Sequence, residues 1–198
     1  AAAAVTPSVR IGNYVQILSK TTQVSGTLSA VDMAGKKGEM AYQIARRGLE
    51  LKKDLEYSLV RNQASAAGNA STARAMGGIE AGISTNKSVG SSGAQTAISG
   101  AAWTAPTDGT QRTFTETLLK AVIKDMWSNG GDPKLIMLGP VSKQNFSGFA
   151  GIAANRYQVG DGPGKIVAGV EVYMSDFGET VAVPSRIQRD RTALVIDP

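Results

Sequence analysis

The stretch from Asp32 to Asn62 constrains the fold most, because it is a long run of chain without a proline. Asp32 is a residue type that caps helix N-termini, and the only weak helix formers after it are Gly35, Gly38 and Gly48. These features predict one long helix. At about 1.5 Å per residue it would be roughly 40 Å long, more than the core of a small domain can cover.

Apolar side chains recur along this expected helix at spacings of four and seven residues. They are Met40, Ile44, Leu51, Leu55 and Leu59. Such spacing places them on one face, and we expect this stripe to be core. The charged residues opposite it are Lys36, Lys37, Arg46, Arg47, Glu50, Lys52, Lys53, Asp54 and Glu56. They predict either a solvated face or ion pairs between subunits.

Before the helix, apolar and polar residues alternate from Val9 to Ser19. The apolar odd positions are Val9, Ile11, Val15 and Ile17. A period of two is typical of a half-buried strand, which would be roughly 35 to 45 Å long if extended through Val24. The residues before Val5 offer no hairpin partner. We therefore expect the partner strand to come from a missing upstream segment or from another subunit.

The segment from Ala64 to Arg112 is rich in alanine, glycine, serine and threonine. It predicts a short helix around Ser71 to Ala81 and otherwise a long irregular loop. Loops of this length in small domains are usually functional or ordered by a partner. We therefore expect an assembly subunit and not an autonomous monomer.

Helix and strand signals follow one another in the rest of the chain. Thr113 and Glu116 have the spacing of a capping box, and a helix with an apolar face from Leu118 to Trp127 is expected after them. Ser142 is expected to cap a short helix that ends at Phe149. The expected strands are Leu135 to Leu138, Ile166 to Met174, Thr180 to Val183 and Thr192 to Ile196. Because strands and helices do not alternate as repeated units, this order predicts an α+β fold.

The composition excludes most enzymatic chemistry. The chain has no histidine and no cysteine, so it lacks an imidazole base, a thiol nucleophile and the usual zinc ligands. The run from Gly160 to Lys165 lacks the first glycine and the Ser or Thr of a phosphate-binding loop, and the triplet from Asp176 to Gly178 stands without the other kinase motifs. We expect turns at both places, and no enzyme activity, cofactor or metal.

The formal net charge of +5 predicts proximity to an anionic partner, although the excess is small for 198 residues. No apolar run approaches the roughly 20 residues of a membrane span, and the first residues lack the pattern of a signal peptide. The sequence therefore predicts a soluble, intracellular protein without a membrane partner.

The order of these elements resembles that of the major capsid proteins of tailed bacteriophages, which share the Hong Kong 97 fold. The stretches that carry the resemblance are Arg10-Ile-Gly-Asn-Tyr14, Val24-Ser-Gly-Thr27, Glu50-Leu-Lys-Lys-Asp54 with Glu56, Asn69-Ala-Ser71, Arg74-Ala-Met-Gly-Gly-Ile-Glu80, Ser175-Asp-Phe-Gly178, Arg186-Ile-Gln-Arg-Asp-Arg-Thr-Ala193 and Asp197-Pro198. Their specificity lies in their order across nearly the whole chain.

The resemblance implies a division of the chain into the parts of that fold. Residues 1–31 would be the returning half of an extended loop that overlies a neighbouring subunit, and residues 32–112 a peripheral domain with a spine helix over 32–63. Residues 113–177 would be a mixed α/β axial domain around fivefold and sixfold axes, and residues 178–198 strands that return to the peripheral domain. By this resemblance we expect the chain to be a fragment that lacks the N-terminal arm and the ascending half of the loop.

The implied function is that of a major capsid subunit that self-assembles into an icosahedral shell around the double-stranded DNA genome of a tailed phage. Its partners would be copies of itself in pentamers and hexamers, packaged DNA on the inner face, and portal, scaffold or decoration proteins. It would be located in the virion capsid after assembly in the host cytoplasm. The residues expected at contacts between subunits are Arg10, Tyr14, Ile17, Lys20, Arg46, Arg47, Glu50, Lys53 and Glu56.

Two other functions fit the sequence. An encapsulin-like compartment would use the same fold to hold protein cargo without a genome, but the stretches from Arg74 to Glu80 and from Arg186 to Ala193 favour the viral interpretation. A basic nucleic-acid-binding module would bind DNA as a monomer or dimer. Its weakness is that aromatic residues make up only 6% of the chain and no reading helix is recognisable.

Overall fold

The computed structural model of the chain describes residues 8, 10–31, 34–35, 38–95, 98, 100–149 and 171–198. The predictions that involve Val9, Asp32, Lys36 and Lys37 lie outside these residues, as do the expected turn at 160–165 and the start of the strand expected at Ile166. The described chain divides into two units, one within residues 1–82 and 98–105 and one within residues 83–97 and 106–198.

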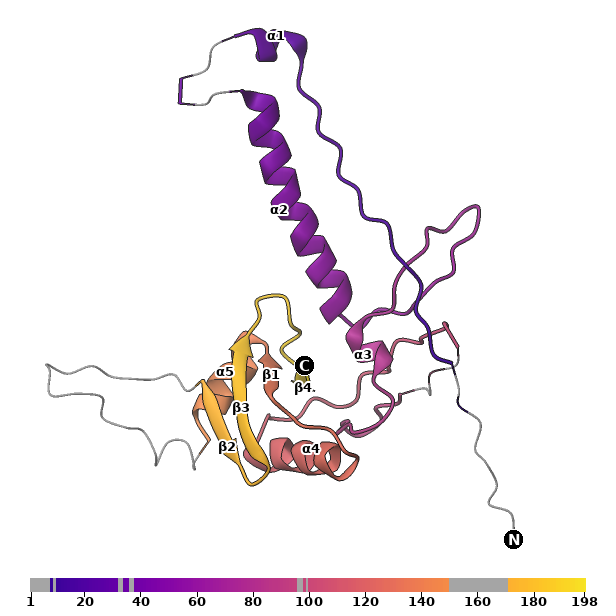
Figure 1. Cartoon of the computed structure of the whole chain (residues 1–198), viewed down its shortest axis with the longest axis vertical. Coiled ribbons are helices and arrows are strands. Elements are labelled where there is room, and N and C mark those ends of the chain that lie inside the picture. The colour runs from indigo at the N-terminus through magenta and orange to yellow at the C-terminus, as the bar shows by residue number, and fades with distance from the viewer. Residues whose placement is uncertain are drawn as a thin grey trace, which may run out of the picture. The chain divides into compact units, whose positions relative to one another are not determined.

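The first unit contains three helices among its described residues, α1 (Gly26–Ala30), α2 (Glu39–Val60) and α3 (Ile79–Gly82). Residues 10–25, which we call the arm, precede α1 as an extended segment. Figure 1 shows that the chain reverses direction at α1, so that the arm leads toward it and α2 leads back. The Ser25 side chain caps α1 by accepting a hydrogen bond from the Leu28 amide at 3.3 Å. The sequence did not predict α1.

The predicted long helix is wrong at its N-terminal end, because α2 begins only at Glu39. Gly35 and Gly38 have φ angles of 84° and 83°, which no right-handed helix contains. α2 therefore has 22 residues and is about 33 Å long. Its C-terminal end at Val60 agrees with the prediction to within a few residues.

The arm is extended, but it is not paired as a strand with any described residue. This agrees with the expectation that no partner strand lies within the described chain, and pairing of the arm with a strand of another subunit stays a prediction. The Gly12 amide donates a hydrogen bond to the Gly100 carbonyl at 3.1 Å. Because the arm has no ladder of backbone bonds, its position depends on side chains.

The corner between α2 and α3 requires glycine where segments approach closely. A Cβ at Gly78 would lie 1.9 Å from the Arg61 carbonyl oxygen, and a Cβ at Gly82 would lie 2.6 Å from the Trp103 ring. Since neither position has room for a side chain, glycine is needed at both. Residues 71–78 are not helical, so the helix predicted around 71–81 is reduced to α3.

Among its described residues, the second unit contains two helices and a sheet with one parallel and two antiparallel strand pairs. Its elements are α4 (Glu116–Ser128), β1 (Leu135–Leu138), α5 (Pro140–Ser147), β2 (Val172–Ser175), β3 (Gly178–Pro184) and β4 (Ala193–Ile196). The strands form one sheet in the order β2-β3-β1-β4, in which β1 and β3 are parallel and the other pairs antiparallel. This small mixed sheet confirms an α+β fold. The division at residue 178 implied by the resemblance does not coincide with the observed units, because β3 and β4 complete this sheet.

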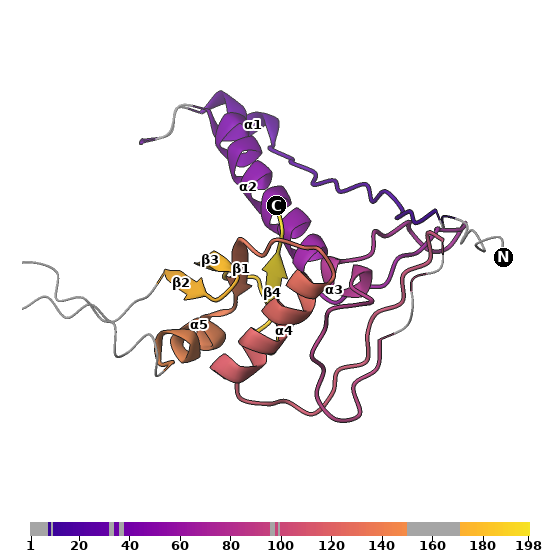
Figure 2. The same ribbon diagram turned by 60° about the horizontal axis from the view of Figure 1, so that its bottom comes forward.

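The main hydrophobic core lies between one face of this sheet and helices α4 and α5 (Figure 2). Its buried side chains are Leu119, Ile123, Ile136, Leu138, Phe146, Phe149, Tyr173 and Ala182. The buried strand predicted at Leu135 to Leu138 and most of the predicted apolar face of α4 are confirmed. Trp127 is the exception, since it is exposed and its ring contacts Phe177 at a centroid distance of 5.6 Å.

Both helix starts in this unit differ from the predicted ones. Thr115 is the N-cap of α4 and makes no side-chain cap bond, so the capping box predicted at Thr113 is wrong. α5 begins at Pro140, which suits a first helical turn because that turn needs no amide donor. Ser142 is buried within α5, and its hydroxyl donates to the Asp190 carbonyl at 2.9 Å.

The irregular loop predicted within residues 64–112 makes contacts within its own chain that were not predicted. Ala94 and Thr107 form an antiparallel bridge, and the Arg112 guanidinium donates to the Ser88 carbonyl at 2.8 Å. A Cβ at Gly90 would lie 2.1 Å from the Thr110 carbonyl oxygen, so the two sides of this loop touch through their backbones. The described residues of this loop therefore have contacts of their own within the chain, and ordering of the loop by a partner stays a prediction.

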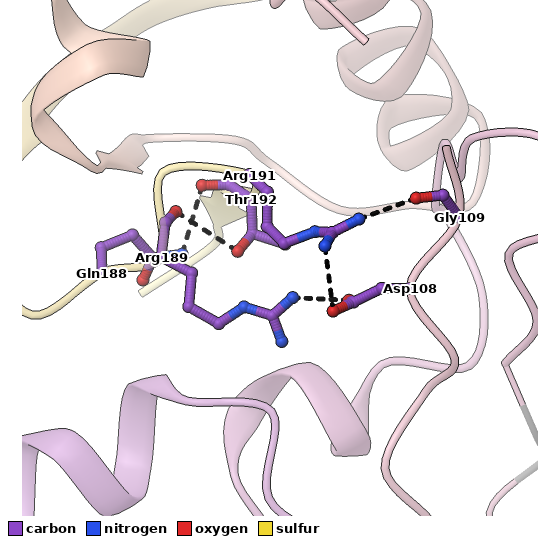
Figure 3. A network of polar contacts seen from close by, with 6 residues as sticks. All are labelled: Asp108, Gly109, Gln188, Arg189, Arg191 and Thr192. Carbon is purple, nitrogen blue, oxygen red and sulfur yellow. Dashed lines mark hydrogen bonds and ion pairs between the residues drawn. The ribbon is translucent and has the colours of Figure 1, made fainter. Parts of the chain in front are cut away.

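Two arginines join this loop to the turn before β4 (Figure 3). The Arg189 guanidinium lies 2.5 Å and the Arg191 guanidinium 3.3 Å from oxygens of the Asp108 carboxylate. Arg191 also donates to the Gly109 carbonyl at 2.7 Å. We call Asp108, Arg189 and Arg191 the clasp. Because both guanidinium groups form ion pairs with the same carboxylate, the clasp depends on Asp108.

Replacing Asp108 by Ala is expected to lower the free energy of unfolding by about 1 kcal/mol, since the carboxylate is partly exposed. It should also speed cleavage of residues 88–112 by a non-specific protease, measured by mass spectrometry. Asp132→Ala is the control, because it removes a pair between two exposed side chains, Asp132 and Lys134. Unchanged cleavage in Asp108→Ala would show that the clasp does not hold the loop.

Candidate intersubunit contact surfaces

One side of the arm carries three exposed apolar side chains. Ile11, Val15 and Ile17 are 56%, 72% and 89% exposed, and we call them the arm surface. Tyr14 and Gln16, which alternate with Val15 and Ile17, are half-buried. Alternate residues of extended backbone point to opposite sides, so the arm presents its apolar side outward.

Two side-chain amides attach the root of the arm to the corner of the first unit. The Asn13 amide group donates to the Gly77 carbonyl at 3.0 Å and accepts from the Gly77 amide at 2.9 Å, as a paired strand residue would. The Gln16 carbonyl oxygen accepts from the Met76 amide and from Gln63, both at 3.2 Å. These anchors were not predicted from the sequence, where the signal for them is that polar Asn13 occupies one of the odd, otherwise apolar positions of the arm.

Further along the arm, Lys20 forms an ion pair with Asp54 of α2 at 2.7 Å. Both side chains are about one-third to one-half exposed, so the pair contributes little to stability. Of the other predicted contact residues of the arm, Arg10 is exposed and Tyr14 is half-buried. The arm therefore lies on its own α2 through a polar contact and not through its apolar side.

The apolar stripe of α2 is also exposed, so the prediction that it belongs to the core is wrong for the described chain. Ile44 is 57% and Leu55 44% exposed, and Met40 and Leu59 are exposed as well. We call the four exposed residues Met40, Ile44, Leu55 and Leu59 the helix surface, whereas Leu51, the fifth residue of the predicted stripe, is half-buried. The better covered face of α2 is polar and consists of Glu39, Gln43, Glu50, Asp54 and Ser58, together with Leu51.

Three of the five predicted charged contact residues on α2, Arg46, Arg47 and Glu50, form ion pairs within the helix. Arg47 donates to the Glu50 carboxylate at 2.6 Å, and Arg46 lies 3.9 Å from the same group. The hydrogen bond from Arg47 lowers the pKa of Glu50. Lys53 and Glu56 are exposed. These residues are thus accessible at the surface, and their role in subunit contacts stays a prediction.

A third apolar surface, on the second unit, was not predicted. Val172, Met174, Val181 and Val183 are exposed on the face of the sheet opposite the core. Their alternation with buried Tyr173, Thr180 and Ala182 is the period-two signal that could have found them. Among the residues that the structure describes, no cluster of three or more acidic side chains is placed to hold a metal ion, and no helix is long and apolar enough to cross a membrane.

Exposed apolar surfaces of this extent are typical of a subunit that is completed by contacts in a larger assembly. The chain belongs to the SU10 major capsid protein family, whose family model matches residues 1–198. A segment of 58 residues, 29% of the chain, is 40% identical to the major capsid protein of Escherichia phage Phieco32. The matched segment spans 16% of the length of that protein.

Proposed function

We propose that this chain is a major capsid subunit of a tailed phage and that its copies assemble into an icosahedral shell around a double-stranded DNA genome. The observation that carries the proposal is the exposure of the arm surface and the helix surface in a member of a capsid protein family. Copies of the chain, arranged by symmetry, would cover both surfaces.

Within this proposal the chain has the Hong Kong 97 fold. The arm and α2 are the returning half of the extended loop and the spine helix of a peripheral domain, and the second unit is the axial domain. The order of elements supports this assignment, because the extended segment and long helix precede a mixed sheet whose core helices lie on one face.

The proposed partners follow from the same assignment. Copies of the chain form pentamers and hexamers, and the arm surface lies on a neighbouring copy. The formal net charge of +5 favours non-specific contact with packaged DNA. The protein would reside in the virion capsid after assembly in the host cytoplasm, with portal, scaffold or decoration proteins as further partners.

Electron microscopy of the purified full-length protein tests the proposal. We expect closed icosahedral particles, and we expect particles recovered from phage to keep double-stranded DNA after nuclease treatment. Particles that hold protein cargo and no nucleic acid would favour an encapsulin-like compartment. A monomer or dimer whose binding to DNA falls steeply with salt would favour a nucleic-acid-binding module.

A further inference from the structure

Asn129 and Gly130 lie at the C-terminal end of α4 and form the one Asn-Gly pair in the sequence. In such a pair the backbone nitrogen of the glycine can attack the side-chain amide carbon of the asparagine, because glycine has no Cβ to hinder the approach. This chemistry makes asparagine a thermolabile residue. Asn129 is exposed, so water reaches it. The pair is therefore a candidate site of deamidation.

Two acceptors hold the side-chain amide of Asn129. Its Nδ2 donates to the Asp125 carbonyl at 2.8 Å, one turn earlier in α4, and to the side-chain oxygen of Asn86 at 2.6 Å. In deamidation Nδ2 is the atom that leaves as ammonia. Rotation of the side chain toward the following residue breaks both hydrogen bonds, so both restrain the reaction.

The attacking nitrogen is restrained as well. The Gly130 amide donates to the Trp127 carbonyl at 3.0 Å, and the amide of Gly131 donates to the Met126 carbonyl at 3.0 Å. Gly130 has a φ angle of 88°, the left-handed conformation that commonly ends a helix. Because helix ends fray more easily than helix centres, opening of this last turn alone frees the nitrogen.

Asn86 supplies its acceptor from outside α4, in the loop between α3 and α4. It has a φ angle of 51°, a left-handed conformation that asparagine adopts more readily than most other residues. Asn86 is half-buried. Its side chain thus connects the loop to the end of α4 through the amide group that deamidation would remove.

We propose that Asn129 is a deamidation site and that Asn86 slows the reaction by holding the side-chain amide. The Gly130 nitrogen loses its proton and bonds to Cγ of Asn129, the bond from Cγ to Nδ2 breaks, and ammonia leaves with that proton. Water then opens the cyclic imide. The net reaction consumes a water molecule, releases ammonia and transfers no electrons. The product is aspartate or isoaspartate at position 129.

The new carboxylate destabilises the end of α4. It cannot donate to the Asp125 carbonyl, and its negative charge lies at a helix C-terminus, where the helix dipole opposes it. Isoaspartate also adds a methylene to the backbone of the turn. Deamidation therefore loosens the last turn of α4.

Peptide mapping by mass spectrometry of the full-length protein, incubated as free subunits, tests the proposal. Asn129 should deamidate faster than every other asparagine of the chain. It should react at least about tenfold more slowly than in the same protein unfolded by denaturant, because several hydrogen bonds have to open first. The rate should rise from neutral to mildly alkaline pH, since the attacking nitrogen must lose its proton.

Three substitutions test the part played by Asn86. Asn86→Gly should speed deamidation of Asn129 about fivefold, because it removes the acceptor while glycine keeps the left-handed backbone. Asn86→Asp keeps an oxygen acceptor and should leave the rate within about twofold of the wild type. Lys87→Gly loosens the same loop at an exposed position and keeps the acceptor, so it should also leave the rate unchanged.

Asn129→Asp imitates one of the two products. Hydrogen exchange at the amides of Gly130 and Gly131 should become about fivefold faster in this variant, because a bond is lost and the helix dipole opposes the new charge. Exchange in β1 should not change.

Faster deamidation at another asparagine, or an equal rate at Asn129 in folded and unfolded protein, would overturn the proposal. An unchanged rate in Asn86→Gly, or an equal increase in Lys87→Gly, would show that the Asn86 side chain does not hold the amide. Unchanged hydrogen exchange in Asn129→Asp would show that the product does not loosen α4. These results do not depend on particle formation, so the proposed function is tested separately.

Discussion

Replacing Ile17 by Asp is expected to abolish particle formation by the full-length protein while the free subunit keeps its fold. Ile17 is 89% exposed in the chain, so a carboxylate there meets only water in the free subunit. In the particle the same position would lie against a neighbour, where the lost burial of isoleucine costs about 1.5 to 3 kcal/mol and the buried charge costs more. Because every copy repeats the defect, we expect particle yield to fall at least about tenfold.

The measurements are far-ultraviolet circular dichroism of the free subunit and the yield of particles by sedimentation and electron microscopy. Ile17→Leu is the matched control, since it keeps the apolar volume, and it should assemble normally. A changed spectrum in Ile17→Asp would place the side chain in the core of its own subunit. A normal yield would show that the arm surface makes no important contact.

Replacing Leu138 by Ala should destabilise the free subunit by about 2 to 5 kcal/mol, whereas the same replacement at Leu55 should cost under about 1 kcal/mol. Leu138 is 0% exposed between the sheet and its helices, so its truncation leaves a cavity. Leu55 is 44% exposed, and its truncation removes little buried surface. The two variants delete the same atoms, and only their surroundings differ.

Denaturant titration of unassembled subunits measures both effects, and particle yield separates the roles of the two residues. We expect Leu55→Ala to lower the yield of particles despite its small effect on the subunit, because Leu55 belongs to the helix surface. A cost at Leu55 equal to that at Leu138 would mean that α2 is packed within its own chain, as its periodicity first predicted.

The second unit was the more predictable part of the fold. The apolar run from Leu135 to Leu138, the apolar face around Leu119 and Ile123, and the strands at 178–184 and 193–196 are all found near the predicted bounds. Local patterns sufficed there, because the apolar faces of β1 and α4 pack together in one core of the same chain. α5 begins at Pro140 and not after the predicted cap Ser142. Both residue types are common at helix starts, and the sequence alone does not show which of the two begins the helix.

The first unit was less predictable, for two different reasons. Two glycines with positive φ, Gly35 and Gly38, delay the start of α2, and a glycine in the sequence does not reveal its φ. The stripe from Met40 to Leu59 was identified correctly as an apolar face and wrongly as core. Periodicity shows that a face is apolar, but it does not show whether the same chain covers it.

The sequence by itself determined that the arm, α2 and α4 each have an apolar side, where the longest described helix ends, and that the chain resembles a capsid protein. It did so because side-chain periodicity, helix propensity and motif order are local properties of the chain. Only the tertiary structure decided that the sheet, α4 and α5 share the main core, that Asn13 and Gln16 anchor the arm, and that Asp108 joins a loop to the turn before β4. These contacts bring together residues far apart in the chain, and their pairing depends on how the whole backbone folds.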